Sequence, residues 1–338
     1  MSPIRKVILL VIFFYLMSII YRAMNLKELI NASVNISLID ETDYYLKFHH
    51  SKEAEAIHLD SNNIYYVDYS KIKSLGVLNQ KSYYPITIGL GSLRSLQAFK
   101  LTHDSLKYKI FIANSDWLCE NIDSSGNWPT MHNKEIGNEV LVAPWPSAMS
   151  QGLGMSVLTR AYKITLDSTY LISARKAILS FGRTIPEGGV RTNNKFGIFY
   201  EEYPLESNST HVLNGFIYSL YGLYDLWCLD SNLLAKEYFE EGISTLTNTL
   251  PMYDIGHWTR YDLNPIKNLR NHWGYCSPWY QKLHIAQLSS IYLITEDKMF
   301  EDYAKKFAQQ EQSSFINYII YPAYVLYTDF VYLKRSIL

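Results

Sequence analysis

The chain has 338 residues, of which 48% are hydrophobic and 19% charged, and its formal net charge is -1 at pH 7. The hydrophobic share is large enough to bury a core, which excludes an intrinsically disordered chain, and the lack of a basic tract argues against a general nucleic-acid-binding protein. The three cysteines show no CxxC or Cys/His spacing, so the sequence indicates neither a zinc site nor a disulfide scaffold.

The first predicted element is an apolar run from Val7 to Tyr21, with Arg5 and Lys6 before it and Arg22 after it. The run is about 15 residues long, short of the roughly 20 that a full span needs, and no small-x-small cleavage motif follows it. We expect residues 1–24 to form an uncleaved signal-anchor, with a cleaved signal peptide as the alternative. A single-pass anchor would place the rest of the chain in the Golgi lumen of a eukaryote or in the periplasm or cell envelope of a bacterium.

Residues 25–85 are expected to form a linker and a short β element. The stretches NIYYVDYS (63–70) and KSYYPITI (81–88) alternate apolar and polar residues in the manner of short strands. We interpret them as a small hairpin that packs on a larger helical domain.

Four similar stretches then recur along the chain: AFKLTHDS (98–105), AYKITLDS (161–168), LYDLWCLDS (223–231) and IYLITED (291–297). Their aromatic residues lie at nearly regular intervals, which is typical of a repeat architecture. These residues are Phe99, Tyr162, Tyr224 and Tyr292. Each stretch ends an apolar helix and begins an amphipathic one, and Asp167 or Ser168, Ser231 and Asp297 are candidate N-caps.

Residues 86–314 are therefore predicted to form four αα-hairpins. Because the first helix of each pair is apolar nearly all round, we expect an α/α toroid with the first helices in an inner ring. A solenoid of stacked helix pairs is the alternative. The tail, 315–338, is apolar but broken by Asn317, Pro322 and Asp329, so we expect a packed tail, with a second membrane span as the alternative.

The connectors between hairpins are long, spanning roughly 124–146, 183–211 and 251–281. All leave an outer helix and enter the next inner one, so they should gather at one end of a toroid. Long connectors in a compact domain are usually functional. This predicts a site built from glutamate, tyrosine, tryptophan and arginine side chains.

Glu201 and Glu202 lie in one of these connectors, within FYEEYP (199–204). They are neighbours, so their side chains should diverge and only one is expected to enter a cleft. Opposed glycosidase carboxylates are not indicated. Glutamate with tyrosines suits removal of the C5 proton of a uronic acid, with a cation holding its carboxylate. Re-protonation from the opposite face gives the C5 epimer, whereas loss of the C4 substituent gives an unsaturated sugar, and the residues alone leave both reactions open.

Several of these stretches, in order, resemble the C-terminal domain of the D-glucuronyl C5-epimerases of heparan sulfate and heparosan modification. The resemblance covers about residues 83 to 312. It is carried by YYPITIGLG (83–91), PSAMSQG (146–152), TRAY (159–162), FYEEYP, HVLNGFIYSLYGLYDL (211–226), LPMYD (250–254), RYDL (260–263), WY (279–280) and HIAQL (284–288). It implies an α/α toroid that converts glucuronic to iduronic acid within a heparosan-like or N-sulfated heparosan-like chain, without a redox cofactor. A uronate lyase on the same scaffold and a non-catalytic glycan-binding protein are the alternatives.

Carried over residue by residue, the family's catalytic groups match Glu202, Tyr203, Tyr261 and Tyr280. Tyr261 and Tyr280 are separated by one residue more than in the family. The family's basic residue after YDL is Asn264 here, so the expected anion contacts are Arg191, Arg260 and Arg270.

Further candidate substrate contacts are Asn214, Trp145 and Gln151, each with a structural role in the core or at a helix end as the alternative. His284 is interpreted as a core histidine, and Glu201 as a structural neighbour of Glu202 that pairs with an arginine. No metal site is expected. The expected partners are an acidic polysaccharide and a membrane, a homodimer stays open, and nucleic acid is not expected.

Overall fold

A computed structural model describes residues 3–33, 57–69, 81–136, 139–264 and 275–337. The chain divides into two compact units. One comprises His49–Asp254 and Arg260–Tyr275, and we call it the catalytic-motif unit because it contains FYEEYP. The other comprises Met1–Phe48, Ile255–Thr259 and Cys276–Leu338, and we call it the terminal unit.

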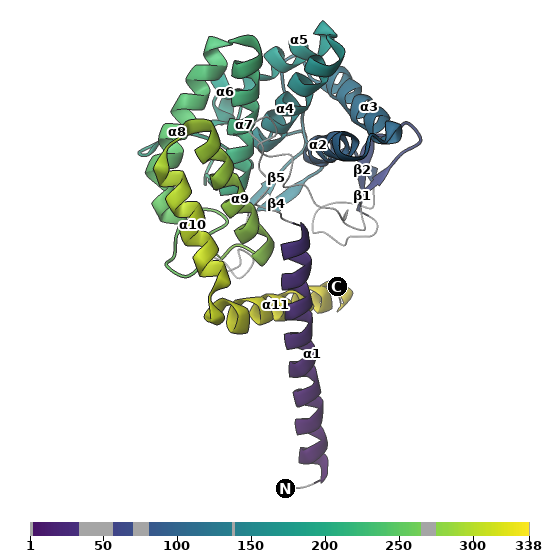
Figure 1. The fold of residues 1–338 in the computed structure, drawn as a ribbon, viewed down its shortest axis with the longest axis vertical. Coiled ribbons are helices and arrows are strands. Elements are labelled where there is room, and N and C mark those ends of the chain that lie inside the picture. Colours follow the sequence, from purple (N-terminus) through teal and green to yellow (C-terminus); the bar gives the residue numbers. More distant parts are fainter. Residues whose placement is uncertain (1–2, 34–56, 70–80, 137–138, 265–274, 338) are drawn as a thin grey trace. The chain divides into compact units, whose positions relative to one another are not determined.

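The catalytic-motif unit contains three consecutive αα-hairpins (Figure 1). They are α2 (Pro85–Thr102) with α3 (Ser105–Asn121), α4 (Ala148–Thr165) with α5 (Ser168–Ala177), and α7 (Leu213–Asp230) with α8 (Leu233–Tyr253). The first helices pack side by side in the order α2, α4, α7, and the second helices flank them. All residues of α4 from Ala148 to Ala161 are buried, which confirms the prediction of apolar inner helices.

Glycines allow α4 and α7 to approach very closely. A Cβ atom added at Gly152 would lie 2.2 Å from the carbonyl oxygen of Tyr218, and one added at Gly222 would lie 2.2 Å from the carbonyl oxygen of Gly152. Since real side chains do not approach backbone so closely, both helices need glycine at the crossing.

The predicted turns between paired helices share one geometry. The last helical residue is followed by a residue with positive φ, and the next residue caps the second helix with its side chain. The turn residues are His103, Leu166, Ser231 and Glu296, and the caps are Asp104, Asp167, Asn232 and Asp297. The prediction of Ser231 as a cap is wrong by one residue. Trp227, not Tyr224, is the equivalent of the other repeat aromatics, because its carbonyl accepts the turn's N–H.

The β elements are short. β1 (Ile57–Leu59), β2 (Tyr65–Asp68) and β3 (Lys81–Ser82) form an antiparallel sheet in that order, which confirms the small N-terminal β element. The strand expected over 81–88 stops at Ser82, because Pro85 begins α2 and proline favours a helix start. Two further hairpins were not predicted: β4 (Lys134–Ile136) with β5 (Glu139–Leu141), and β6 (Arg191–Asn194) with β7 (Gly197–Tyr200). A short helix α6 (Leu179–Gly182) and a 3-10 turn (Ile185–Glu187) precede β6.

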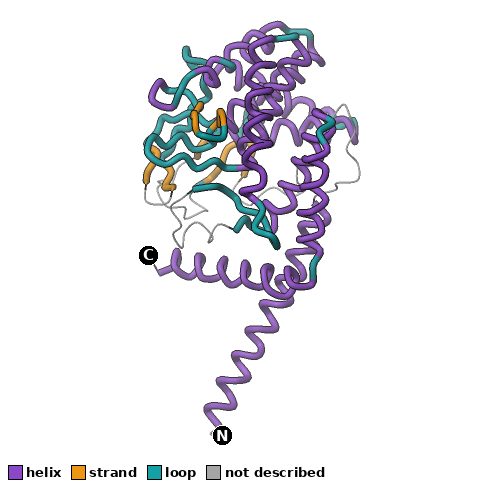
Figure 2. The backbone as a smooth tube through the Cα atoms, turned by 90° about the vertical axis from the view of Figure 1, so that its left-hand side faces the viewer, coloured by secondary structure: helices purple, strands orange, loops and turns teal. Residues whose placement is uncertain are grey.

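The terminal unit contains the fourth hairpin, α9 (Pro278–Thr295) with α10 (Lys298–Gln312). A π-helical turn (Ile316–Ile320) then leads into α11 (Tyr321–Ile337), which crosses the N-terminal helix α1 (Pro3–Ser33) (Figure 2). The tail is thus a packed helix, and Pro322 lies in its first turn instead of breaking it. The fold is mainly α and built of paired helices, with small β elements and an apolar N-terminal helix, as the sequence predicts.

Candidate functional site

The FYEEYP stretch leaves the end of β7 and runs past the start of α4. The Glu201 N–H donates to the carbonyl of Val190 (2.8 Å), and the Glu201 carbonyl accepts from the Ala148 N–H (2.9 Å). Successive side chains of extended chain point to opposite sides, so the two glutamates enter different surroundings. Both are buried, with exposed fractions of 0% for Glu201 and 4% for Glu202.

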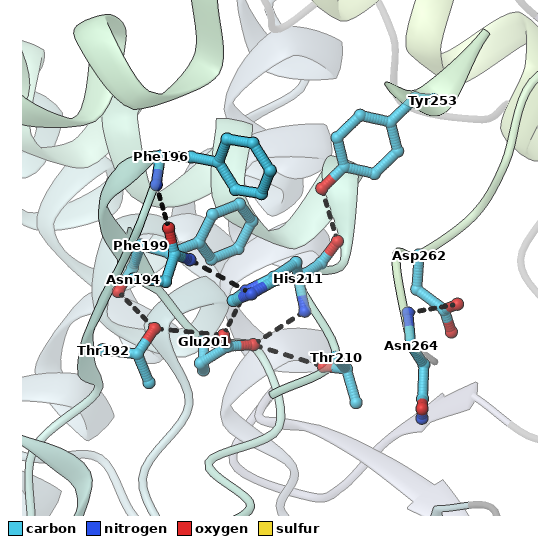
Figure 3. A network of polar contacts seen from close by, with 10 residues as sticks. All are labelled: Thr192, Asn194, Phe196, Phe199, Glu201, Thr210, His211, Tyr253, Asp262 and Asn264. Carbon is cyan, nitrogen blue, oxygen red and sulfur yellow. Dashed lines mark hydrogen bonds and ion pairs between the residues drawn. The ribbon is translucent and has the colours of Figure 1, made fainter. Parts of the chain in front are cut away.

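Glu201 is held by a dense set of polar contacts (Figure 3). Its carboxylate accepts hydrogen bonds from the hydroxyls of Thr192 and Thr210 (3.3 Å each) and from the backbone N–H of His211 (3.0 Å). The Nδ1 atom of His211 lies 2.6 Å from its Oε1 atom. We call Thr192, Glu201, Thr210 and His211 the Glu201 network. The side chain nearest its carboxylate is that of a histidine and not of the expected arginine.

The Glu201 network is itself tied to neighbouring elements. His211 contacts the Asn194 amide through Nε2 (3.2 Å), and its carbonyl accepts from the Tyr253 hydroxyl (2.5 Å). It therefore fastens the β6–β7 hairpin to the end of α8. This arrangement makes Glu201 a structural acid.

Glu202 lies in a different pocket. Its Oε2 atom is buried and has no hydrogen-bond partner among the residues that the structure describes. A Cβ atom at Gly215, in the first turn of α7, would lie 2.3 Å from that oxygen, so glycine makes room for the carboxyl group. Burial raises the Glu202 pKa to about 7, although a hydrogen bond with Tyr203 and the charge of Lys134 oppose the rise. A group with a pKa near 7 can both accept and donate a proton at neutral pH.

Lys134, on β4, supplies positive charge to this pocket. Its Nζ atom lies 4.8 Å from the centre of the Tyr203 ring, as in a cation–π contact. Burial lowers the Lys134 pKa, and the carboxylate of Glu202 acts in the opposite direction. We call Lys134, Glu202, Tyr203 and Gly215 the Glu202 pocket. The sequence reasoning missed Lys134 and Gly215; the one available signal was a lysine in a connector already expected to be functional.

An aromatic cluster adjoins the pocket. Trp145 and Tyr203 are buried with their ring centres 6.2 Å apart, and Tyr261 packs against the same cluster. The Tyr261 carbonyl accepts from the N–H of Leu213, which ties the RYDL stretch to the start of α7 (3.1 Å). The structure therefore brings Glu202, Tyr203 and Tyr261 into one region of one unit.

Asp262 is a second acid with a shifted pKa, and no role was predicted for it from the sequence. Burial raises its pKa to about 6, while a hydrogen bond from the Asn264 N–H (3.3 Å) and the charge of Arg260 lower it. Its negative charge raises the Glu202 pKa further.

Two of the predicted substrate contacts use their polar side-chain atoms on the protein backbone. Gln151 is fully buried, accepting from the Trp128 N–H (2.9 Å) and donating to the Gly126 carbonyl (2.6 Å). Trp145 donates through Nε1 to the His132 carbonyl (2.9 Å). Gln151 and Trp145 therefore have the structural role that was the alternative to substrate contact.

Asn214 is buried next to Gly215, the glycine that makes room for Glu202, and its Nδ2 atom lies 4.0 Å from the sulfur of Met149. Arg191 donates to Glu241 (3.0 Å) and lies over the ring of Tyr238, so its guanidinium already has protein partners. Arg260 is half-buried beside Asp262, and its N–H donates to the Tyr253 carbonyl (2.8 Å). Arg270 lies outside the described residues.

Tyr280 belongs to the terminal unit, in the first turn of α9, with its N–H donating to the Ser277 hydroxyl (3.3 Å). His284, one turn further on, is fully buried with Nδ1 3.0 Å from the Thr259 hydroxyl, and burial lowers its pKa to about 3. It is a core histidine. The catalytic roles of Glu202, Tyr203, Tyr261 and Tyr280 stay predictions.

Comparison with known proteins bears on these observations. A 170-residue stretch is 44% identical to a D-glucuronyl C5-epimerase of Caenorhabditis elegans, covering 46% of this chain and 27% of that protein. A 169-residue stretch is 31% identical to an uncharacterized protein of Methanocaldococcus jannaschii, covering 49% of this chain and 52% of the other. The matches thus span about a quarter of the Caenorhabditis elegans protein and about half of the Methanocaldococcus jannaschii protein.

Among solved structures, an unsaturated glucuronyl hydrolase from Bacillus sp. GL1 is similar with a TM-score of 0.48 and 15% identity, over 67% of this chain and 61% of that one. The sequence profile of the D-glucuronyl C5-epimerase C-terminus matches residues 122–309, which contain the Glu201 network, the Glu202 pocket and Tyr280. More than half of the chain falls within that match, and the chain therefore belongs to the D-glucuronyl C5-epimerase C-terminal family.

Proposed function

We propose that the protein is a polysaccharide D-glucuronyl C5-epimerase, which converts glucuronic to iduronic acid in a heparosan-like or heparan-sulfate-like chain. The observation that carries the proposal is Glu202: a buried carboxyl group with a pKa near 7 and a free oxygen, in a chain of this family. Burying an incompletely hydrogen-bonded acid costs stability, so its presence in such a place points to a function, and its pKa suits proton transfer at carbon.

The reaction begins with transfer of the C5 proton to a base on one face of the sugar. The electron pair left on C5 delocalises into the adjacent carboxylate, where charge builds up. Among the described cations, Lys134 suits this role, because it is half-buried and its positive charge lowers the Glu202 pKa. Arg260 is a second candidate on the RYDL stretch. Return of a proton to the opposite face of C5 completes the epimerisation.

Two groups are then needed for proton transfer, one for each face. Glu202 is the proposed group on one face, and Tyr261, in the same unit, is the proposed group on the other. Tyr203, which hydrogen-bonds Glu202 and lies beneath Lys134, is proposed to hold the carboxyl group in position. No cofactor takes part in this scheme, because the proton transferred out and the proton transferred in balance the reaction.

The test is incubation of the purified full chain with N-sulfated heparosan in heavy water. We expect deuterium at C5 and new iduronate signals by proton NMR. A folded protein that yields neither refutes the proposal. Ultraviolet absorbance from an unsaturated uronate would instead identify a lyase.

A further inference from the structure

An exposed apolar stripe runs along the C-terminal helix α11. Its members are separated by three, four or seven residues, which is one or two helical turns, so they share one side of the helix. They begin in the turn before α11 and are Phe315, Ile319, Leu326, Phe330 and Leu333, with exposed fractions between 43% and 65%. Monomeric soluble proteins rarely leave such a contiguous stripe in water. We call these residues the α11 stripe.

The opposite side of α11 packs on protein. Tyr321 and Val325 are buried, and the Tyr321 hydroxyl donates to Glu311 of α10 (2.9 Å). Tyr321 also lies edge-on to Trp258, 6.4 Å between ring centres. The α11 stripe therefore faces away from the body of the terminal unit.

Helix α1 projects on that same side (Figure 2). Its residues Ile8–Glu28 form the one described helix apolar and long enough to span a membrane, with a mean hydropathy of 1.9. Every side chain from Ile8 to Phe14 is between 48% and 62% exposed, so this part of α1 protrudes without protein around it. By contrast, Ile19 and Ala23 are buried.

A cluster of polar contacts fixes the point where the two helices cross. Arg22 donates to both carboxylate oxygens of Asp329 (2.7 Å each), and the Tyr15 hydroxyl donates to the same group (3.2 Å). Lys27 donates to Asn317 (2.6 Å) at the other end of the contact. The angle and depth of α11 relative to α1 are thereby set.

These dimensions match a bilayer. From Pro3 to Arg22 an α-helix rises about 29 Å, close to the roughly 30 Å of the hydrocarbon core. Asp329 pairs with Arg22 at the end of that rise and also contacts Tyr15, about 10 Å further into the span, so α11 crosses α1 within the outermost 10 Å or so, where an interfacial helix lies. Tyrosine and arginine are residues that favour this boundary.

We infer that α11 is an interfacial membrane helix, lying in the bilayer surface with its stripe in the outer part of the acyl region while α1 spans the bilayer. The protein would then hold the membrane at two places. A single anchor lets a domain swing freely, whereas a spanning helix locked to an interfacial one fixes the orientation of the terminal unit against the lipid.

Depth-dependent fluorescence quenching tests the inference. In a background in which Cys119 and Cys228 are serine and the buried Cys276 is kept, single cysteines at Leu326 or Phe330 are labelled with an environment-sensitive dye. The full chain is reconstituted into vesicles of phosphatidylcholine and phosphatidylserine. Thr328, exposed on the other side of α11, is the matched control position, and Val11 reports on α1.

We expect labels at Leu326 and Phe330 to be quenched several-fold more by lipids brominated near the headgroup than the label at Thr328. The Val11 label should respond to lipids brominated near the chain ends, and the Thr328 label to aqueous iodide. Equal iodide quenching at Leu326, Phe330 and Thr328 overturns the inference, as does the absence of deep quenching at Val11. Protection of Leu326 from bromine and iodide alike, rising with protein density, would show that a second copy covers the stripe. Since none of these readouts measures epimerisation, their failure is separate from failure of the proposed function.

Discussion

Glu201 and Glu202 are adjacent in the sequence and both buried, but the Glu201 network and the Glu202 pocket surround their carboxyl groups in opposite ways. Glu201 receives three hydrogen bonds and a histidine contact, whereas Glu202 keeps an oxygen without a partner and a pKa raised to about 7. Burial alone therefore does not mark a functional acid. The distinguishing observation is how completely the surrounding groups satisfy the charge.

The largest expected effect separates the two acids by activity. Glu202→Gln removes the proton-transfer group while keeping the shape of the side chain, so C5 deuterium exchange should fall by about 10²–10⁴-fold. Exchange within a few-fold of wild type would break the comparison, because Glu202 would then be no more functional than its neighbour.

The second effect separates them by stability, with opposite signs. Glu201→Gln should lower the free energy of unfolding by about 3 kcal/mol, because it leaves His211 and the network's donors without their charged acceptor. At pH values above 7, Glu202→Gln should increase the free energy of unfolding, because the wild-type carboxyl group must ionise in a buried site.

The pH dependence gives the reason for the second sign. Glu202 has an ordinary pKa of 4.5 when unfolded and about 7 when folded, so between these values the folded state holds a proton that the unfolded state has lost. The stability of the wild type therefore falls as pH rises from 4.5 to 7, by about 3 kcal/mol in all. Chemical denaturation of the wild type and both variants at pH 5 and pH 8 measures this fall. If the free energy of unfolding changes equally between the two pH values for Glu202→Gln and wild type, the assignment is contradicted.

Gly215→Ala is expected to have a smaller effect on stability, about 1–2 kcal/mol, because the new methyl group must displace the Glu202 carboxyl group. Exchange activity should fall with it. Ser219→Ala, one turn along the same helix, adds no atom and should keep activity. Thermal unfolding and heavy-water exchange of both variants, compared side by side, check the prediction; a fully active Gly215→Ala would mean that the carboxyl group need not occupy its observed position.

The smallest expected effect is a shift in titration. Lys134→Met should lower the rate, since it removes the proposed carboxylate contact, and it also removes a positive charge that lowers the Glu202 pKa, so the ionisation near pH 7 in the remaining rate profile should move upward. Lys195→Met, an exposed lysine in the β6–β7 turn, should leave it unchanged. An unshifted profile for Lys134→Met would remove Lys134 from the Glu202 pocket.

The repeated turns explain why much of the helical fold could be predicted. Each hairpin depends on local chemistry, a cap and an aromatic at fixed spacing, which a sequence displays directly. Errors arose where neighbouring residues compete for one role, as with Ser231 and Asn232. The β4–β5 and β6–β7 hairpins were missed because their strands are three or four residues long and carry little alternation.

The site was predictable only in part, and for a physical reason. Glu202, Tyr203 and Tyr261 could be found because they lie in recognisable motifs. Lys134 could not, since its importance depends on where β4 lies in three dimensions. Nor could the sequence show that the Gln151 amide hydrogen-bonds backbone groups through both its oxygen and its nitrogen, instead of a sugar.

The glycine crossing of α4 and α7 has a consequence for how the proposed epimerase could change its preference among glycans. Two backbones in direct contact cannot slide or spread, so the pair acts as a fixed mount. FYEEYP is hydrogen-bonded to the start of α4, RYDL to the start of α7, and the Trp128 backbone to Gln151 within α4. Under the proposed function, connector loops attached to this pair could be lengthened, shortened or recharged by mutation while the proposed reacting groups keep their spacing, so that substrate choice could evolve separately from proton transfer.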